Sequence, residues 1–489
     1  MELNTAKKII KKAIEDSKGF YSKAKTAIDY YHNNSDIVRT GAAAIEEVNR
    51  FLQQIGRNPL RSADNRIPTN WHRIITDQKV GYLFTYPPAF DADNKAVNDG
   101  ILNTLGDDYE TVMRSLGTDA TNCGRAWLHY WYGKQPDGKP LPFQYHFIDP
   151  LQVLPIYDTE NIKMPLKMLV RTYLVTDEKG IEYKRYELWT DTEVSYFYEK
   201  ACETDTDKQG ITAETMILNG NSAEKVLKHP YGEIPFIEFR NNAYCMGDLQ
   251  MYKRLIDAMD KLISGFANDV DDIQEIVWVI KNYAGDTIDT VYDKDGNEVD
   301  RQIDLLQEIK ARKVLHVDSD GGVDKLTAEI PYEARMKLYE ILEKQIYISA
   351  MAVNPNPERT GQATGTYIEF LYSLLELKAG LTETAFRAAL GRLVKAILRY
   401  NGQDETMQVQ QTWTRNKPRV DTEIADIING TPDDILSRRT KTKAHPLVED
   451  YQEELKQIAK ESEQFSEPEM FPGGKKGEQN GNDGEGEGT

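Results

Sequence analysis

Residues 133–140 have the residue types of a phosphate-binding loop. The stretch reads GKQPDGKP and contains the pattern G-x-x-x-x-G-K, in which backbone amides and the lysine would hold phosphate groups. The next position is Pro140, where magnesium binding needs Ser or Thr. Pro136 and Pro140 also disfavour the helix whose first turn would face the phosphate. We therefore interpret the stretch as a hairpin loop and not as a nucleotide site.

The sequence gives no better support for a calcium site, a zinc site or a catalytic nucleophile than for a nucleotide site. Residues 293–297, DKDGN, begin like a calcium loop, but the glycine is fourth where the motif needs it sixth. The seven histidines show no H-x-x-x-H spacing, and Cys123, Cys202 and Cys245 show no C-x-x-C spacing. No G-x-S-x-G motif occurs. We therefore expect no catalytic residue, no metal site and no cofactor, and a protein that is not an enzyme.

The composition narrows the class of protein. The chain has 489 residues, 40% of them hydrophobic, and its 60 Lys and Arg against 79 Asp and Glu give a net charge of −19. The length predicts about three folded units. The charge argues against a conventional DNA-binding protein, which must neutralise phosphates. No run of 18 apolar residues and no signal peptide occurs, so we expect no membrane contact and a reducing, cytoplasmic compartment.

Residues 4–32 have apolar positions at helical spacing and predict a helix. Its first turns carry four lysines, Lys7, Lys8, Lys11 and Lys12. A basic amphipathic helix of this kind can lie on a membrane or on nucleic acid. Because Glu15 and Asp16 interrupt the basic charge, a solvated face is the favoured interpretation. From about residue 66 to 125 the pattern stays mainly helical.

Residues 126–240 change character. Short segments rich in aromatic and β-branched residues follow one another: WLHYWYG, QYHFID, KMLVRTYLVT, YKRYELWT and VSYFYE. Turn signals at 137–138 and 179–180 separate them, which predicts a meandering antiparallel sheet. Aromatic side chains can stack on single-stranded bases, but their alternation favours one face that simply forms a core.

A heptad pattern follows the sheet. Its apolar members, spaced alternately by three and four, are Leu249, Tyr252, Ile256, Met259, Ile263, Phe266, Val270, Ile273 and Val277. The pattern predicts a long helix with one apolar seam that needs a partner helix along its length. That partner can be another helix of the same core or a helix of another subunit.

The rest of the chain divides at turn signals. Those at 295–296 and 321–322 lie in a small strand-containing insert, and Pro331 is placed to begin a further helix. Residues 352–366, AVNPNPERTGQATGT, cannot be helical. Residues 367–400 predict one helix about 50 Å long, apolar on more than one face and therefore buried by several neighbours.

This ordered set of segments resembles the portal proteins of long-tailed bacteriophages. The stretches that carry the resemblance are RIPTNWHRIITDQKVGYLFTYPP (66–88), YGEIPFIEFRNN (231–242), DLQMYKRLIDAMDKLISGFANDVDDI (248–273) and ATGTYIEFLYSLLELKAGLTETAF (363–386). Their order and spacing match over roughly residues 30–460, although no single motif is diagnostic.

The resemblance implies an α+β fold, mainly helical, that forms a ring, usually of twelve subunits. Its expected parts are a β-rich wing (1–245), a first stem helix (246–275), a small α/β clip (276–330), a second stem helix (331–351), a tunnel loop (352–366), a long wing helix (367–400), a crown (401–470) and a disordered acidic tail (471–489).

The implied function is a channel at one vertex of a capsid, through which double-stranded DNA is packaged and ejected. The expected partners are other copies of the chain, the passing DNA, the large terminase subunit, a head–tail connector protein, and the major capsid and scaffolding proteins. Assembly would take place in the host cytoplasm and the final location would be the virion. Two other classes stay open: a nucleotide-binding motor built around 133–140, and an unrelated cytoplasmic helical scaffold.

Four groups of residues are candidates for this role. The seam residues expected to pack between subunits are Ile256, Met259, Ile263, Phe266 and Val270. The stem acids expected to face the channel and repel phosphates are Asp257, Asp260 and Asp271. The tunnel-loop residues expected to make transient contacts with DNA are Asn354, Asn356, Glu358, Arg359, Thr360 and Gln362. The clip residues expected to dock an acidic partner surface are Lys310, Arg312 and Lys313.

The ring size can be checked by arithmetic. Twelve helices about 10 Å apart have a circumference of about 120 Å and an axis circle of about 38 Å. Subtracting one helix diameter of about 10 Å leaves a lumen of about 28 Å. A DNA duplex about 20 Å wide passes through such a lumen, whereas six helices would leave only about 9 Å.

Overall fold

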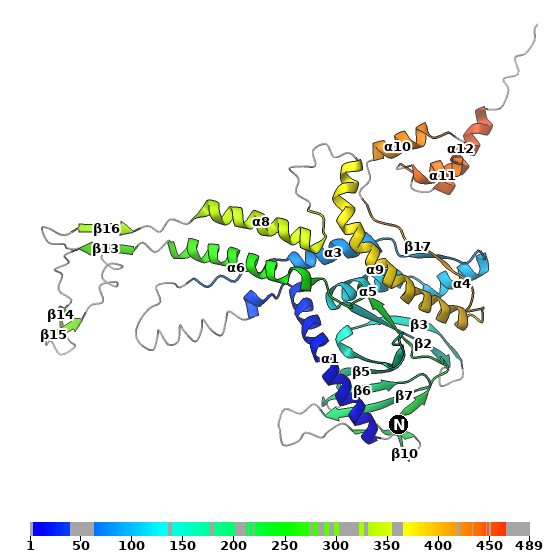
Figure 1. Cartoon of the computed structure of the whole chain (residues 1–489), viewed down its shortest axis with the longest axis horizontal. Coiled ribbons are helices and arrows are strands. Elements are labelled where there is room, and N and C mark those ends of the chain that lie inside the picture. The colour runs from blue at the N-terminus through cyan, green and yellow to red at the C-terminus, as the bar shows by residue number, and fades with distance from the viewer. Residues whose placement is uncertain are drawn as a thin grey trace, which may run out of the picture. The chain divides into compact units, whose positions relative to one another are not determined.

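The computed structural model of the chain (Figure 1) forms two compact units, Met1–Asn356 with Leu371–Asn416, and Pro357–Phe370 with Lys417–Thr489. The residues that it describes are 3–39, 63–134, 139–176, 180–200, 212–213, 215–218, 221–273, 277–281, 288–292, 298–302, 322–326, 331–354, 365–417, 421–432, 434–445, 447–448 and 451–465. It combines helices with antiparallel sheets, in agreement with the α+β class.

The larger unit begins with helices. They are α1 (Leu3–Tyr31), α3 (Trp71–Phe84), α4 (Lys95–Leu105) and α5 (Tyr109–Cys123). The helix predicted over 4–32 is α1, whose buried side includes Ala6, Ile10 and Ala13. The prediction of a mainly helical stretch from about 66 to 125 is confirmed by α3, α4 and α5, although residues 63–70, before α3, have no regular secondary structure. Pro68 accounts for this, since a proline disfavours helical backbone at the residue before it.

Antiparallel strands occupy the stretch predicted as a meander. They are β2 (Arg125–Lys134), β3 (Pro140–Ile148), β4 (Val153–Tyr157), β5 (Leu166–Thr176), β6 (Glu182–Trp189), β7 (Glu193–Lys200), β8 (Thr212–Ala213), β9 (Thr215–Leu218), β10 (Asn221–Glu224), β11 (Val226–Lys228) and β12 (Phe236–Arg240). One sheet has the order β11-β7-β6-β5-β4, with β8 also on β7, and confirms the meander. A second has the order β12-β2-β3, and β9 pairs with β10.

Aromatic side chains of these strands fill the interior. Trp127, Tyr130 and Tyr186 are each 1% exposed, which confirms that aromatic alternation marks a core face. Tyr186 belongs to a cluster in which α1 packs on β4–β7. Tyr130 belongs to a larger cluster that α3, α4, α5 and the long C-terminal helix share.

The heptad seam lies on α6 (Leu249–Ile273), which ends before the last predicted member of the seam. Val277 instead begins β13 (Val277–Lys281), because Val277-Trp-Val-Ile280 favours extended backbone. The strands that follow are β14 (Ile288–Tyr292), β15 (Glu298–Gln302) and β16 (Gly322–Leu326). β13 pairs with β16 and β14 with β15, both antiparallel.

The larger unit also contains helix α8 (Tyr332–Ala350) and, from Leu371 onward, helix α9 (Gly365–Tyr400). α8 lies beside α6 (Figure 1). α9 starts two residues before the predicted helix, and its buried side chains include Leu375, Phe386 and Leu390.

The segment predicted as a crown is divided between the units. β17 (Gln410–Thr412) pairs with β1 (Ala89–Asp91), and 401–416 belong to the larger unit. The smaller unit contains α10 (Asp421–Gly430), α11 (Arg438–Ala444) and α12 (Tyr451–Phe465). The predicted acidic tail, 471–489, lies outside the described residues.

Candidate functional site

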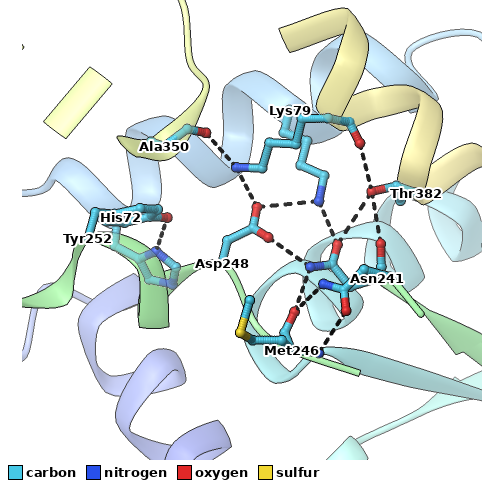
Figure 2. A network of polar contacts seen from close by, with 10 residues as sticks. His72, Lys79, Asn241, Met246, Asp248, Tyr252, Ala350 and Thr382 are labelled. Carbon is cyan, nitrogen blue, oxygen red and sulfur yellow. Dashed lines mark hydrogen bonds and ion pairs between the residues drawn. The ribbon is translucent and has the colours of Figure 1, made fainter. Parts of the chain in front are cut away.

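Helix α6 begins at a buried cluster of charged side chains (Figure 2). Asp248 directly precedes the helix, Lys79 belongs to α3 and Lys378 to α9. One carboxylate oxygen of Asp248, Oδ2, lies 2.6 Å from Lys378 Nζ and 3.3 Å from Lys79 Nζ. The three side chains are 2–6% exposed. Two ammonium groups therefore share one carboxylate in the interior.

Hydrogen bonds connect this trio to two more elements (Figure 2). Lys79 Nζ donates to Asn241 Oδ1 at 2.5 Å, and Asn241 Nδ2 donates to Asp248 Oδ1 at 2.7 Å. Lys378 Nζ donates to the carbonyl of Ala350, the last residue of α8, at 2.8 Å. We call Lys79, Asn241, Asp248 and Lys378 the junction cluster. It joins α3, the segment before α6, the end of α8 and α9.

The charges in the junction cluster stabilise each other against burial. Burial lowers the pKa of Lys79 to about 8, although the charge of Asp248 opposes this shift. Burial alone would raise the pKa of Asp248, but the charges of Lys378 and Lys79 outweigh it and hold that pKa well below its usual range. Asp248 is thus ionised at neutral pH, and the cluster carries a net positive charge while Lys79 keeps its proton.

Close backbone packing places the loop that carries Asp248. Gly124 ends α5 with a φ of +87°, and a Cβ there would lie 2.1 Å from the carbonyl oxygen of Cys245. A Cβ on Gly247 would lie 2.2 Å from the carbonyl oxygen of Asn122. Only glycine fits at either position, so these two residues let the loop lie directly on the end of α5.

The proximal part of the α6 seam packs within the chain. Tyr252, Ile256 and Met259 are 0–1% exposed and contact Leu342 and Ile346 of α8, together with residues of α1 and α3. The assignment of Ile256 and Met259 to subunit packing is therefore corrected, because neither side chain has surface left for another subunit. A heptad seam specifies a partner helix, and α8 of the same chain is that partner.

The distal part of the seam is more open. Ile263 and Phe266 are partly buried, and Val270 is 41% exposed. The ring of Phe266 lies 6.3 Å from that of Tyr332, and the Arg335 guanidinium lies 5.5 Å from the Phe266 ring centre. Arg335 also forms an ion pair with Asp269. The C-terminal end of α6 thus faces the N-terminal end of α8, so the two helices run antiparallel.

The three stem acids have different environments, and the structure corrects one of them. Asp260 is 1% exposed and accepts hydrogen bonds from Ser35 Oγ and from the backbone and side chain of Thr69, so it cannot face a channel. Asp257 pairs with Lys253 Nζ at 2.8 Å and accepts a hydrogen bond from Tyr30. Asp271 is the most open of the three, although it accepts a hydrogen bond from Asn65 Nδ2 at 2.5 Å.

An extended segment, residues 64–69, runs along α6, and we call it the strap. Three alternate backbone amides of the strap donate to oxygens of α6 side chains spaced four residues apart. The pairs are Asn65 N to Asn268 Oδ1 at 2.5 Å, Ile67 N to Ser264 Oγ at 2.9 Å and Thr69 N to Asp260 Oδ1 at 2.8 Å. These polar residues of α6 thus bind a second part of the chain and do not form a solvated face.

The predicted tunnel loop, 352–366, is described at residues 352–354 and at 365–366, where α9 already begins. Gln78 of α3 donates through Nε2 to the Val353 carbonyl and accepts from the Val353 amide through Oε1, both at 2.9 Å. Val353 is 7% exposed and Asn354 is partly buried. The other predicted loop residues, Asn356, Glu358, Arg359, Thr360 and Gln362, lie outside the described residues. So do the predicted clip residues Lys310, Arg312 and Lys313.

The two loops with binding-site patterns join strands. Residues 133–140 connect β2 to β3, which pair antiparallel, so the G-x-x-x-x-G-K pattern lacks the helix that a phosphate loop needs. Residues 293–297 connect the paired strands β14 and β15. Within the described ranges, no three His, Cys, Asp or Glu side chains are grouped to hold a metal ion. None of the described helices combines the length and apolar content needed to cross a membrane.

Comparisons with known proteins agree on one family. A sequence profile described as "Phage portal protein, SPP1 Gp6-like" matches residues 10–467. The portal protein of Clostridium phage phiCD119 is 35% identical over 445 residues, which cover 87% of this chain and 90% of that protein. The portal protein of Bacillus phage SPP1 is 30% identical over 416 residues, which cover 83% of this chain and 77% of that protein.

Among solved structures, the neck of a native gene transfer agent particle, computed with C12 symmetry, is similar over 76% of this chain and 86% of that chain. The identity is 13% and the TM-score is 0.38, too low for a conclusion about shared structure.

Proposed function

The chain belongs to the SPP1 Gp6-like family of phage portal proteins, and from this membership we propose how its elements form the portal. As a portal protein it is a structural component of the capsid through which phage DNA is packaged. We propose that α6 and α8 are the stem that surrounds the DNA, in a ring of about twelve subunits, a number that the lumen arithmetic allows.

The observation that carries this proposal is the self-contained pairing of α6 with α8. The proximal part of their seam is closed within one chain, one end of the pair is held by the junction cluster, and the other end leads into the paired strands β13 and β16. A rigid two-helix unit of this kind can stand beside identical copies without exchanging its core. The strands β13–β16 then lie at the end of the stem furthest from the junction cluster, where a clip would meet its partners.

Contact between subunits needs surface that the chain does not bury itself. α9 offers such a surface, since Leu374, Leu377 and Leu381 are 41%, 63% and 63% exposed and are spaced along one side of the helix. α8 adds Ile341 and Ile348, at 50% and 47%. Burying a leucine side chain contributes about 1.5–3 kcal/mol. We propose that these residues, together with Ile263, Phe266 and Val270, form the subunit interface.

Three further assignments complete the proposal. Asp271, and the open side of Asp257, would face the passing DNA and keep it from binding tightly. Residues 354–362 would form a collar of weak contacts, with Glu358 and Arg359 cancelling each other's charge. Lys310, Arg312 and Lys313 would dock the terminase large subunit during packaging and a connector protein afterwards, in a portal assembled in the host cytoplasm with capsid and scaffolding proteins.

A double variant tests the ring. Leu377→Asp with Leu381→Asp should leave a folded chain that no longer forms rings, because two exposed leucines become charges within the interface. Ile162→Asp is the matched control, since Ile162 is 98% exposed in a turn outside these helices. Sedimentation velocity and negative-stain images give the assembly state. Full-size rings from the double variant would place the interface elsewhere.

A further inference from the structure

Helix α1 carries a dense row of basic side chains that the portal function does not use. The lysine face consists of Lys7, Lys8, Lys11, Lys12, Lys18, Lys23 and Lys25. All seven are exposed or partly exposed. Between residues 7 and 25 the acids are Glu15 and Asp16, so this part of an acidic chain has a net charge of +5. In the part of the chain that the structure describes, none of these lysines forms an ion pair.

The opposite side of α1 is already occupied. Ala6, Ile10 and Ala13 are 0–3% exposed and pack on β4–β7. A helix that binds a membrane must insert an apolar face, and here that face belongs to the protein core. The membrane alternative that a basic amphipathic helix raises is therefore not available to α1, and only its charge remains to recognise a partner.

The chemistry of the lysine face indicates the class of partner. It contains seven lysines and no arginine, with Tyr21 as the one large hydrophobic residue between residues 7 and 25 that is more than 36% exposed. Protein interfaces are enriched in aromatic residues and arginine and depleted in lysine. Flexible lysine side chains with compact charges are instead suited to binding a regular polyanion, because its evenly spaced anionic groups can be neutralised without a fixed hydrogen-bond geometry. From Lys8 to Lys25 the helix rises about 26 Å, a length over which duplex DNA presents about 15 phosphates.

We propose that the lysine face of α1 binds duplex DNA through its phosphates and without sequence preference, on a surface that is separate from the channel. The lysines precede the contact between Tyr30 and Asp257, where α1 meets the stem helix α6. The face can therefore hold DNA that lies against the wing, in addition to the DNA that passes through the ring. The net negative charge of the chain does not oppose this strongly, because charges beyond about 8–10 Å are screened at physiological salt.

The test uses the full chain and covalently closed circular duplex DNA, which cannot thread through a closed ring. The variant is Lys8→Gln with Lys11→Gln and Lys12→Gln, because glutamine removes the charge, stays polar and has nearly the helix propensity of lysine. The matched control removes the same charge at three exposed lysines on other elements, Lys95, Lys228 and Lys395. Binding is measured by co-sedimentation over a range of salt concentrations, and ring assembly of each protein is checked by sedimentation velocity.

Each lost phosphate contact reduces the salt slope by about 0.9. The α1 variant should therefore have a slope shallower by about 2.7, so that between about 50 and about 200 mM salt the parent chain loses roughly 40-fold more affinity than the variant. The control should keep the parent slope. The proposal is overturned if the α1 variant keeps the parent slope. The proposal is also overturned if the parent chain does not bind circular DNA at about 50 mM salt, even if it binds poly-glutamate or vesicles of anionic lipid. This test does not depend on the proposed α9 interface, so loss of rings in the Leu377→Asp, Leu381→Asp variant would not change how the DNA-binding result is interpreted.

Discussion

Removing the carboxylate of Asp248 should destabilise the protein far more than removing one of its two lysine partners. In Asp248→Asn the ammonium groups of Lys79 and Lys378 stay buried beside a neutral amide. Breaking a buried pair by deleting one partner costs about 3–5 kcal/mol, because the charge left behind is uncompensated. We expect a loss in this range, since the carboxylate has contacts of 2.6 and 3.3 Å and is 2% exposed.

Lys79→Met gives the contrasting case. The fall in the pKa of Lys79 from 10.5 to about 8 means that its charge is buried at a cost of about 3 kcal/mol, which this variant removes. The variant removes the 2.5 Å hydrogen bond to Asn241 Oδ1 and leaves only the 3.5 Å contact from Thr382 Oγ1, at a cost of about 1–3 kcal/mol. It keeps the pair of Asp248 with Lys378. The two effects roughly cancel, so we expect a change within about 2 kcal/mol of zero.

Urea unfolding, followed by tryptophan fluorescence under conditions where every variant has the same assembly state, measures both effects. Asp99→Asn is the control for the change from carboxylate to amide, since Asp99 is exposed on α4. The double variant Asp248→Asn with Lys79→Met should recover part of the loss, because one buried charge remains instead of two. If Asp248→Asn costs no more than Lys79→Met, the shared carboxylate is not what stabilises the junction cluster.

Two further predictions concern the same region. The pKa of Lys79 is lower in the folded state, so the unfolded chain binds more protons between about pH 8 and 10.5. The contribution of Lys79 to the unfolding free energy should therefore rise with pH across that window, and this rise should be absent in Lys79→Met. Unfolding midpoints that change with pH in parallel for the two proteins would contradict this. Asp260→Ala should leave Ser35 and Thr69 without their acceptor, at a cost of about 1–3 kcal/mol in stability, and should expose the strap to limited proteolysis. Asp257→Ala should leave the strap protected. Equal cleavage of both variants would show that Asp260 does not hold the strap.

Local patterns were sufficient for most helices and strands. The helix at 4–32, the aromatic meander and the long helix ending at Tyr400 each have a periodicity that repeats over many residues, and the structure contains all three. The end of α6 was harder to place, because Val277 continues the heptad spacing while the β-branched run around it favours a strand. A boundary of this kind depends on whether the helical or the strand preference is stronger, and the spacing of apolar residues alone does not decide that.

The candidate site was less predictable, because its contacts are distant in sequence. A heptad seam does not distinguish a partner in the same chain from one in another subunit, so Ile256 and Met259 were assigned to the wrong one. The junction cluster joins Lys79 to Asn241 and Asp248 across 162 and 169 residues. The sequence hint was weak, because Lys79 and Lys378 stand two residues after an acid, Asp77 and Glu376, as surface lysines of a helix commonly do.

The spacing of the strap along α6 limits how long such an arrangement can be. Two extended residues advance about 6.6 Å, whereas four helical residues advance about 6.0 Å. The two advances nearly match, so three alternate amides of the strap each meet a side chain on successive turns of α6, at 2.5, 2.9 and 2.8 Å. The next position of this spacing toward α3 is Ile256, whose apolar side chain offers no acceptor. The chain turns into α3 at Trp71, two residues after the third pair, so the strap ends where α6 no longer presents a polar side chain at this spacing.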